Sequence, residues 1–162
     1  MKCYYLDTCI WLDFYEQRGE NGEYALKLIL KLLANDDLVI YSDLHLREFK
    51  RLGYSLEEIN NLFKILKPGH IRRVHIHPES IAKARTLCLQ RRVPWGDALH
   101  ALLAQRNIAL MVSRDNDFEK LRDVCETKKP EEIYRKSFSN SAIASSRALC
   151  NRSSVVLRFD AP

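Results

Sequence analysis

Residues 3–10 read Cys3-Tyr4-Tyr5-Leu6-Asp7-Thr8-Cys9-Ile10, and this stretch decides the fold class. Its first half, residues 3–6, is dense in apolar and aromatic residues, which is typical of a buried strand. Asp7 follows the strand at once, and Thr8 is a plausible N-cap for a helix. A strand that is apolar without alternation indicates a parallel sheet whose two faces are both covered.

The rest of the chain repeats this step from strand to helix. Further strands are predicted at residues 38–41, 71–77 and 108–113, with a short last strand at 124–125. Helices are predicted at residues 23–34, 56–66, 80–91 and 97–104, and others after Thr8, Ser42 and Asp117. Strands that alternate with helices predict an α/β protein with a mostly parallel sheet covered on both faces.

The composition is that of a soluble globular protein. The chain has 162 residues, of which 46% are apolar and 29% are charged, so we expect one domain with a core of its own. No apolar run approaches the ~18 residues that are needed to cross a bilayer, so no membrane association is expected. The N-terminus enters a strand at once, so we expect no signal peptide and a cytoplasmic location.

The five cysteines do not form a recognisable site. Their number is odd, and they include no Cys-x-x-Cys pair. This spacing supports neither a zinc site nor a disulfide framework, so we interpret them as reduced thiols.

Positive charge is concentrated at the C-terminal end. Residues 1–134 hold 21 basic and 20 acidic residues, whereas residues 135–162 hold five basic residues and one acidic residue. The second segment is rich in serine, and its helical and strand periodicities fade. We therefore predict a folded domain at 1–134 and a Ser-rich tail at 135–162, which is a flexible tail, a linker or a remnant of an expression vector.

Four acidic residues lie where an apolar segment ends or a helix begins. Asp7 follows the first strand and Asp115 follows the strand at 108–113, while Glu48 and Asp97 lie on helices. Ligand sites of open parallel sheets lie at the carboxyl ends of the strands, so the fold permits the four carboxylates to gather at one point. The usual reason to gather carboxylates is a divalent cation.

Four segments that contain these acids resemble the PIN domain family in their order and spacing. They are Tyr4–Ile10, Leu44–Phe49, Pro94–Ala101 and Val112–Phe118, and the resemblance covers about residues 1–134. Small single-domain members resemble VapC, the toxin half of VapBC toxin–antitoxin pairs. The resemblance implies a three-layer α/β/α sandwich with a four- or five-stranded sheet. It also implies a Mg²⁺- or Mn²⁺-dependent endoribonuclease that cleaves RNA, an antitoxin partner and a homodimer.

The resemblance assigns roles to the acids. Carried over by position, Asp7, Glu48, Asp97 and Asp115 are the catalytic and metal-binding quartet. Asp117 is an alternative fourth member, because it lies two residues beyond Asp115. The family pattern favours the acid nearer the strand, so we interpret Asp117 as the N-cap of the helix that follows.

Five further residues are candidates for binding the substrate. Thr8 and Ser113 offer hydroxyls that would orient a ligand or a water. Arg91, Arg92 and Arg114 flank the proposed site and are candidates for contacts with phosphates.

His100 lies one turn after Asp97 on an apolar helix. A histidine among apolar residues is most simply explained as a packed side chain. We therefore expect it to be buried with a hydrogen-bond partner.

Two other functions remain open from the residues alone. One is a PIN-type nuclease of RNA processing that acts without an antitoxin. The other is a phosphotransfer or phosphatase domain that uses aspartates. A phosphatase of that kind needs an acid two residues after its nucleophile, and this chain has Cys9 at that position. The chain also lacks the glycine-rich motifs that bind nucleotide phosphates.

The helix predicted at residues 23–34, after a loop at 17–22, is unusually apolar. Only Lys27 and Lys31 interrupt it after Glu23, and they form one narrow polar stripe because they lie four residues apart. The sheet cannot cover every apolar position, so we predict that part of this helix binds a partner peptide or a second copy of the chain.

Overall fold

Five parallel strands form the centre of the molecule. The computed structural model describes residues 1–139, with side chains described as far as residue 134. Neighbouring strands all pair in parallel, and the order across the sheet is β3-β2-β1-β4-β5. The strands are β1 (Cys3–Leu6), β2 (Leu38–Ser42), β3 (Ile71–Val74), β4 (Leu110–Val112) and β5 (Thr127–Lys128).

Helices connect the strands and cover the sheet. The α-helices are α1 (Thr8–Tyr15), α2 (Gly19–Ala34), α3 (Asp43–Arg51), α4 (Leu56–Phe63), α5 (Pro78–Arg91), α6 (Trp95–Arg106) and α7 (Pro130–Ser139). Two 3₁₀ helices are η1 (Pro68–His70) and η2 (Asn116–Leu121). Ser42 and Ser55 form capping boxes at the starts of α3 and α4.

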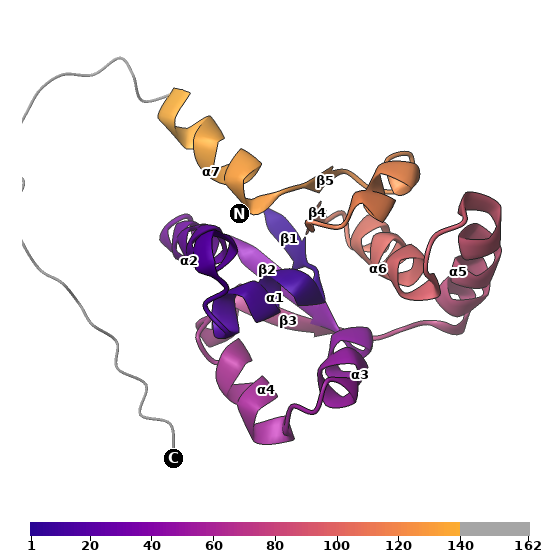
Figure 1. Ribbon diagram of the computed structural model, residues 1–162, viewed down its shortest axis with the longest axis horizontal. Coiled ribbons are helices and arrows are strands. Elements are labelled where there is room, and N and C mark those ends of the chain that lie inside the picture. Colours follow the sequence, from indigo (N-terminus) through magenta and orange to yellow (C-terminus); the bar gives the residue numbers. More distant parts are fainter. Residues whose placement is uncertain (140–162) are drawn as a thin grey trace, which may run out of the picture.

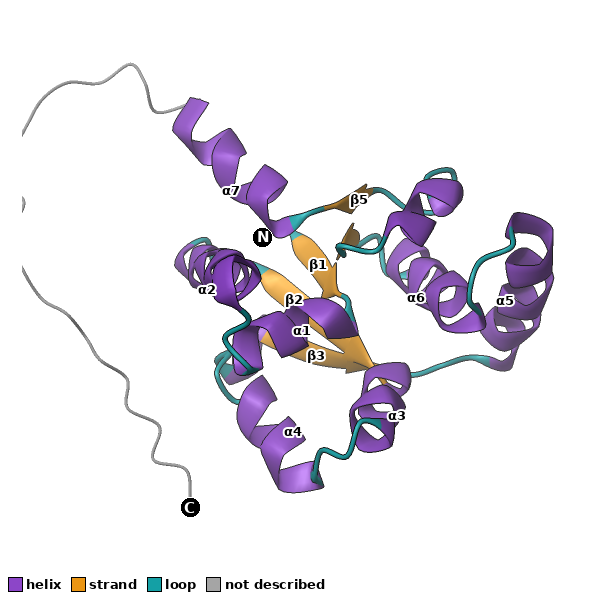
Figure 2. Ribbon diagram, viewed as in Figure 1, coloured by secondary structure: helices purple, strands orange, loops and turns teal. Residues whose placement is uncertain are grey.

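The two faces of the sheet are covered by different helices, so the predicted three-layer α/β/α sandwich is confirmed (Figures 1 and 2). Successive residues of a strand point to opposite faces. Tyr4 and Leu6 therefore belong to the core beneath α1, α2, α4 and α7, whereas Tyr5 belongs to the core beneath α5 and α6. Both cores are mostly apolar, and each large side chain buried in them contributes about 1.5–3 kcal/mol.

The carboxyl end of β1 is the point where the strand order reverses. The chain moves outward from β1 through β2 to β3, and it then returns to β4 on the other side of β1. Leu6 pairs with Val112, and the N–H of Asp7 donates to Val112 O at 2.9 Å. This register places Asp7 beside Ser113. Parallel α/β sheets bind their ligands at such a switch point, so a ligand site is expected at this edge of the sheet.

Helix α2 begins at Gly19, so the predicted loop over residues 17–22 and the predicted helix start at Glu23 were wrong. The glycines and the asparagine of this segment suggested a turn. Gly22 is instead buried against the preceding turn, because a Cβ on it would lie only 2.7 Å from the carbonyl carbon of Gln17. Glycine thus allows the first turn of α2 to pack directly on the chain before it.

Two strands end or begin at other residues than predicted. Strand β3 ends at Val74, and the next helix begins at Pro78 rather than at residue 80. Strand β5 lies at 127–128 rather than at 124–125. Cys125 packs in the core beneath α5 and α6, which explains its apolar character. It lies outside a strand, and its N–H donates to Leu121 O in the turn after η2.

The last described helix, α7, packs against α2, and Lys31 Nζ donates to Ile133 O at 2.6 Å. The helix runs to Ser139, and the predicted Ser-rich tail lies outside the described residues from residue 140 onward. Among residues 1–139, no helix combines the length and the apolar character that crossing a membrane requires.

Candidate active site

Asp7 lies at the carboxyl end of β1 and is held by three donors. Its Oδ1 accepts a hydrogen bond from the N–H of Thr8 at 2.7 Å, so Asp7 is the N-cap of α1 and the prediction of Thr8 as the cap was wrong. Its Oδ2 accepts from Ser113 Oγ at 2.6 Å and from Cys9 Sγ at 3.1 Å. Burial raises the pKa of the Cys9 thiol, which therefore keeps the proton that it donates. These contacts fix the direction of the Asp7 carboxylate.

Asp97, Asp115 and Asp117 form an acidic group of the size that holds a metal ion. One carboxylate oxygen from each of them lies within 4.8 Å of the other two. Asp115 is the N-cap of η2, because its Oδ1 accepts from the N–H of Asp117 at 2.9 Å, so the prediction of Asp117 as the N-cap was wrong. The Asp117 carboxylate joins the group and also pairs with Lys120 at 2.5 Å.

Asp97 is the acid of this group whose ionisation is opposed by burial and by its neighbours. Its Oδ2 is buried and has no hydrogen-bond partner among the described residues. Burial, followed by the negative charges of Asp7 and Asp115, raises the pKa of Asp97 to about 7. The acids present only carboxylate oxygens, which suit a hard divalent cation such as Mg²⁺ or Mn²⁺. A cation would give the unpartnered Asp97 oxygen its missing contact, so the residues fit such an ion.

Glu48 reaches the same region from α3. Its Oε2 accepts hydrogen bonds from the Thr8 hydroxyl and, at 3.1 Å, from His100 Nε2. Burial alone would raise the pKa of Glu48, but the contact with His100 and the bond from Thr8 outweigh it and lower the pKa to about 2. Glu48 therefore stays ionised. Glu48 and Asp97 line one cavity, so the two carboxylates face a common space.

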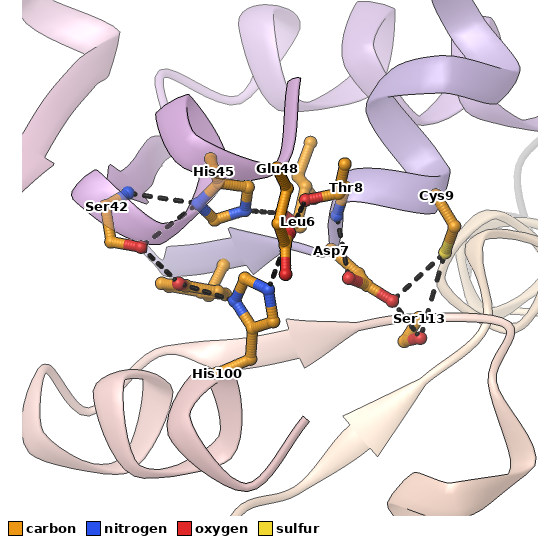
Figure 3. A network of polar contacts seen from close by, with 10 residues as sticks. Leu6, Asp7, Thr8, Cys9, Ser42, His45, Glu48, His100 and Ser113 are labelled. Atoms are coloured by element: carbon orange, nitrogen blue, oxygen red, sulfur yellow. Dashed lines mark hydrogen bonds and ion pairs between the residues drawn. The ribbon is translucent and has the colours of Figure 1, made fainter. Parts of the chain in front are cut away.

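A closed ring of polar groups lies in the core beneath Glu48 (Figure 3). Each member bonds the next, and five different elements or their ends contribute to the ring. The members in order are Glu48, His100, Tyr5, Ser42, His45 and the carbonyl of Leu6, and the chain from Leu6 through Asp7 to Thr8 returns to Glu48. The ring thus connects the positions of Asp7 and Glu48 through the side chains of His100, Tyr5, Ser42 and His45.

The distances in this ring are those of well-formed hydrogen bonds. Tyr5 Oη lies 2.8 Å from His100 Nδ1 and 2.7 Å from Ser42 Oγ. His45 Nδ1 accepts from the N–H of Ser42 at 3.0 Å, so its Nε2 carries the proton that is donated to Leu6 O at 2.7 Å. Burial, together with the nearby His100, lowers the pKa of His45 to about 4, so His45 stays neutral. The expectation that His100 is a packed histidine with a hydrogen-bond partner is confirmed.

The sequence matches the family model described as PIN domain over residues 4–124. The chain belongs to the PIN domain family. No curated protein sequence gives a significant match. Solved structures show that the fold is shared, although their sequences differ widely from this one.

Three of these structures cover most of the PIN domain described here. VapBC2 from Rickettsia felis, bound to a DNA fragment from its promoter, has 17% identity and a TM-score of 0.59, with 78% of this chain and 98% of that chain covered. FitAcB from Neisseria gonorrhoeae has 19% identity and a TM-score of 0.51, with coverages of 79% and 98%. PAE2754 from Pyrobaculum aerophilum has 15% identity and a TM-score of 0.53, with coverages of 86% and 99%.

PIN domains are nucleases, so this chain is a hydrolase of phosphodiester bonds. The four predicted acids come from four places in the PIN domain: the end of β1, helix α3, the first turn of α6 and the loop after β4. Asp97 responds electrostatically to Asp7 and Asp115, and it shares a cavity with Glu48. Asp117 belongs to the same group. The assignment of catalytic and metal-binding roles to these acids stays a prediction.

The predicted substrate residues take other roles in the structure. The hydroxyls of Thr8 and Ser113 hold the carboxylates of Glu48 and Asp7. Arg91 pairs with Asp123 at 2.5 Å. Arg114 pairs with Asp13 at 3.1 Å and with Glu131 at 2.9 Å, so it joins the loop after β4 to α1 and α7. The assignment of these four residues to substrate binding stays a prediction.

Arg92 ends α5 in a left-handed conformation with φ of 52°, and its side chain is exposed. Its carbonyl accepts a bond from Lys120 at 3.5 Å, and its guanidinium has no partner among the described residues. Of the three arginines that were predicted to contact phosphates, Arg92 is therefore the one whose side chain is unpaired among the described residues.

Sequence reasoning missed Tyr5, Ser42 and His45 as parts of the site. The spacing of His45 and Glu48 on α3, three residues apart, places both on one helix face and was the available signal. Tyr5 gave no such signal, because a tyrosine in a buried strand is explained by packing alone. Sequence reasoning also missed Arg47 and Arg51, which line the cavity that Glu48 and Asp97 share.

Proposed function

We propose that this PIN domain is a divalent-metal-dependent endoribonuclease that hydrolyses phosphodiester bonds in RNA. The observation that carries the proposal is the buried, unpartnered Oδ2 of Asp97 within a group of carboxylates. Asp7, Asp97 and Asp115 would hold Mg²⁺ or Mn²⁺ there, with Asp117 as a further ligand. When bound, such an ion acidifies a coordinated water and neutralises charge on phosphate oxygens.

The residues of the chain prepare this site in defined ways. Ser113 holds Asp7 Oδ2, so the Asp7 carboxylate does not rotate away from the acidic group. Thr8 and His100 both bond Glu48 Oε2, which leaves Oε1 to accept a hydrogen bond from a water. A Cβ on Gly96 would lie 3.4 Å from that Oε1, so glycine keeps the space in front of it open. The low pKa of Glu48 makes it an ionised group that orients water rather than a strong base.

Cleavage of structured RNAs tests this function. The wild-type protein is incubated with RNA in Mn²⁺, in Mg²⁺ and in excess chelator, beside Asp7→Asn. We expect cleavage only with metal and none from Asp7→Asn, whereas Asp123→Asn, a change at an exposed acid outside the group, keeps the wild-type rate. Products with 5′-phosphates are expected, as the family resemblance implies. Cleavage that persists in excess chelator would contradict the proposed metal dependence.

We also propose that the enzyme is the toxin of a toxin–antitoxin pair in the cytoplasm, with an antitoxin and a second copy of the chain as its partners. The likeness of its fold to VapBC2 and FitAcB supports this proposal. So does the surface of α2, where Leu26 and Leu30 are 43% and 56% exposed one turn apart. Expression of the wild-type protein is expected to arrest growth, whereas Asp7→Asn is expected to be harmless. Normal growth with active wild-type protein would remove the toxin assignment and leave the nuclease.

A further inference from the structure

A cavity of about 480 Å³ lies beside the acidic group, between α3 and the start of α6. Glu48 and the proposed metal ligand Asp97 both line it. Arg47, Arg51 and Trp95 line the same cavity. The volume falls in the range of roughly 300–1,000 Å³ that is typical of small-molecule sites. The cavity therefore suits one nucleotide and is far too small for a double helix.

Arg47 and Arg51 are the cations of this cavity. They lie four residues apart on α3, so they share one face of the helix. Both are exposed, and neither forms a hydrogen bond or an ion pair among the described residues. Arg91 and Arg114, which the sequence suggested for phosphates, are by contrast engaged with acids. Unpaired guanidinium groups beside a metal site are suited to phosphate oxygens, which they bind through two parallel hydrogen bonds.

Trp95 supplies an aromatic wall to the same cavity. It is the first residue of α6 and lies two residues before Asp97. Its ring is partly buried and packs against the core beneath α5 and α6, which holds it in place. Any nucleic-acid base has a flat face that stacks on such a ring, and stacking is largely indifferent to sequence.

We propose that this cavity binds one nucleotide next to the scissile phosphate of a single strand, with its base against Trp95 and its phosphate at Arg47 and Arg51. The proposal rests on the proposed nuclease function and adds to it the side chains that hold the strand, Arg47, Arg51 and Trp95. A base that is paired within a duplex is not free to enter a cavity, so this cavity takes only an unpaired nucleotide. The nearly neutral body of the chain agrees with a local grip of this kind, because its positive charge is not spread over a wide nucleic-acid surface.

Binding is tested without any cleavage, in the metal-free protein. A short single-stranded RNA of mixed sequence is titrated in while tryptophan fluorescence is recorded. The protein has two tryptophans, and Trp11 is fully buried, so a change on binding reports Trp95. We expect quenching of this signal, no quenching in Trp95→Phe, and binding at least about fivefold weaker in Trp95→Ala than in wild type.

The arginines are tested in the double variant Arg47→Gln/Arg51→Gln by fluorescence anisotropy of a labelled strand. We expect binding to weaken by about tenfold or more at low salt, and the salt dependence to fall by about 0.7 in log–log slope for the one lost phosphate contact. Lys50→Gln is the matched control, because Lys50 is an exposed, unpaired cation on the same helix that does not line the cavity. Equal affinities of the double variant and the Lys50→Gln control would overturn the proposal.

Two further arms complete the test. A single-stranded DNA of the same sequence is expected to bind and to quench, because base faces and phosphates are common to both strands. A perfect RNA duplex is expected to bind at least tenfold more weakly, and equal binding of the duplex would contradict the cavity assignment. Circular dichroism melts of every variant show that it is folded; if Trp95→Ala is not folded, Trp95→Phe and the arginine variant decide.

Failure of this inference and failure of the nuclease assignment give different results. If the strand binds and quenches Trp95 but is not cleaved with any metal, the cavity assignment stands and the proposed function falls. If the strand is cleaved with Mn²⁺ and the arginine and tryptophan variants bind and cleave it like wild type, the nuclease stands and the cavity assignment falls.

Discussion

His100 Nε2 lies 3.1 Å from Glu48 Oε2, although 52 positions separate the two residues in the sequence. Both side chains are largely removed from solvent, with exposed fractions of 2% for His100 and 18% for Glu48. Burial opposes a charged imidazole, but the hydrogen bond from His100 to Glu48 outweighs it and raises the pKa of His100. The contact joins α3 to α6, and α6 also carries Asp97 one turn earlier. The two helices are thus held together at the point where their acids face one cavity.

Tyr5→Phe is expected to destabilise the protein by about 1–3 kcal/mol, because it removes one hydroxyl and leaves His100 Nδ1 without a partner in the core, while Ser42 Oγ keeps only its contact with His45 Nδ1. Urea unfolding measures the loss. Glu48 is also held less firmly, so we expect kcat to fall while KM stays nearly constant.

Tyr4→Phe is the matched control for this prediction. Tyr4 is the preceding residue of β1, is similarly buried and faces the opposite core, and its hydroxyl has no hydrogen-bond partner among the described residues. It should change neither stability nor kcat appreciably. If the two variants lose equal stability, the ring of hydrogen bonds contributes nothing specific.

Asp97→Asn is expected to abolish cleavage and to raise the melting temperature of the metal-free protein at pH 8. Removing one charge relieves repulsion that is worth about 0.8–3 kcal/mol for two carboxylates ~5 Å apart, depending on the effective dielectric. Differential scanning calorimetry measures the change with and without Mn²⁺. Mn²⁺ should stabilise the wild type and leave the variant unchanged, and a lower melting temperature of the metal-free variant would count against a shared carboxylate group.

The pH dependence of the same variant gives an independent check. In the folded, metal-free protein the pKa of Asp97 is raised from 3.8 to about 7, so between these values the folded state binds more protons than the unfolded state. The free energy of unfolding therefore falls as the pH rises from about 4 to 7. His100 acts in the same direction and the neutral His45 in the opposite one. The difference between wild type and Asp97→Asn therefore reports Asp97 together with its effect on the pKa of His100. We expect that difference to grow from pH 5.5 to pH 8.

Arg114 and Arg91 are expected to differ strongly in their contribution to stability. Arg114 pairs with Asp13, whose side chain is only 6% exposed, so Arg114→Gln leaves a buried carboxylate poorly paired and should cost about 3 kcal/mol. Arg114→Lys should not restore the loss, because an ammonium cannot bridge Asp13 and Glu131 as a guanidinium does. Arg91→Gln breaks an exposed pair and should cost less than about 1 kcal/mol. Urea midpoints decide, and similar losses at both sites would refute this distinction.

Leu30→Glu on α2 is expected to weaken assembly with a partner without unfolding the protein, because Leu30 is 56% exposed. Light scattering behind size-exclusion chromatography measures the mass of the wild type and of the variant. Leu89→Glu is the matched control, since Leu89 lies on α5 and is 80% exposed. A wild-type protein that is monomeric alone and also binds no antitoxin would contradict the role given to this helix.

Much of the fold could be predicted because each of its signals is local. The apolar run at Cys3–Leu6 and the capping box at Ser55 depend only on neighbouring residues. Gly22 is a residue whose role depends on a tertiary contact instead. Its freedom suggested a loop, whereas its actual role is to allow close packing against Gln17, which no local pattern reveals.

The residues of the candidate site were likewise predicted only in part. The positions of Asp7 and Asp115 follow from strand ends, and the resemblance supplied Glu48 and Asp97. Asp117 was assigned to the wrong role, because the choice of N-cap between two acids two residues apart depends on a backbone angle. The role of Arg114 as a clamp could not be foreseen, since its partner Asp13 looks like an ordinary helix acid in the sequence.

The contacts of α7 bear on where this protein can be shortened. The family match ends at residue 124, yet β5, the Ile133 side chain and the Glu131 partner of Arg114 all come later in the chain. A version cut at the family boundary would expose the outer edge of β4, open a gap beneath α2 and loosen the loop that carries Asp115. The smallest unit fit for expression therefore reaches at least to residue 134, and proteolysis between β5 and α7 would inactivate the enzyme without touching a single acid of its centre.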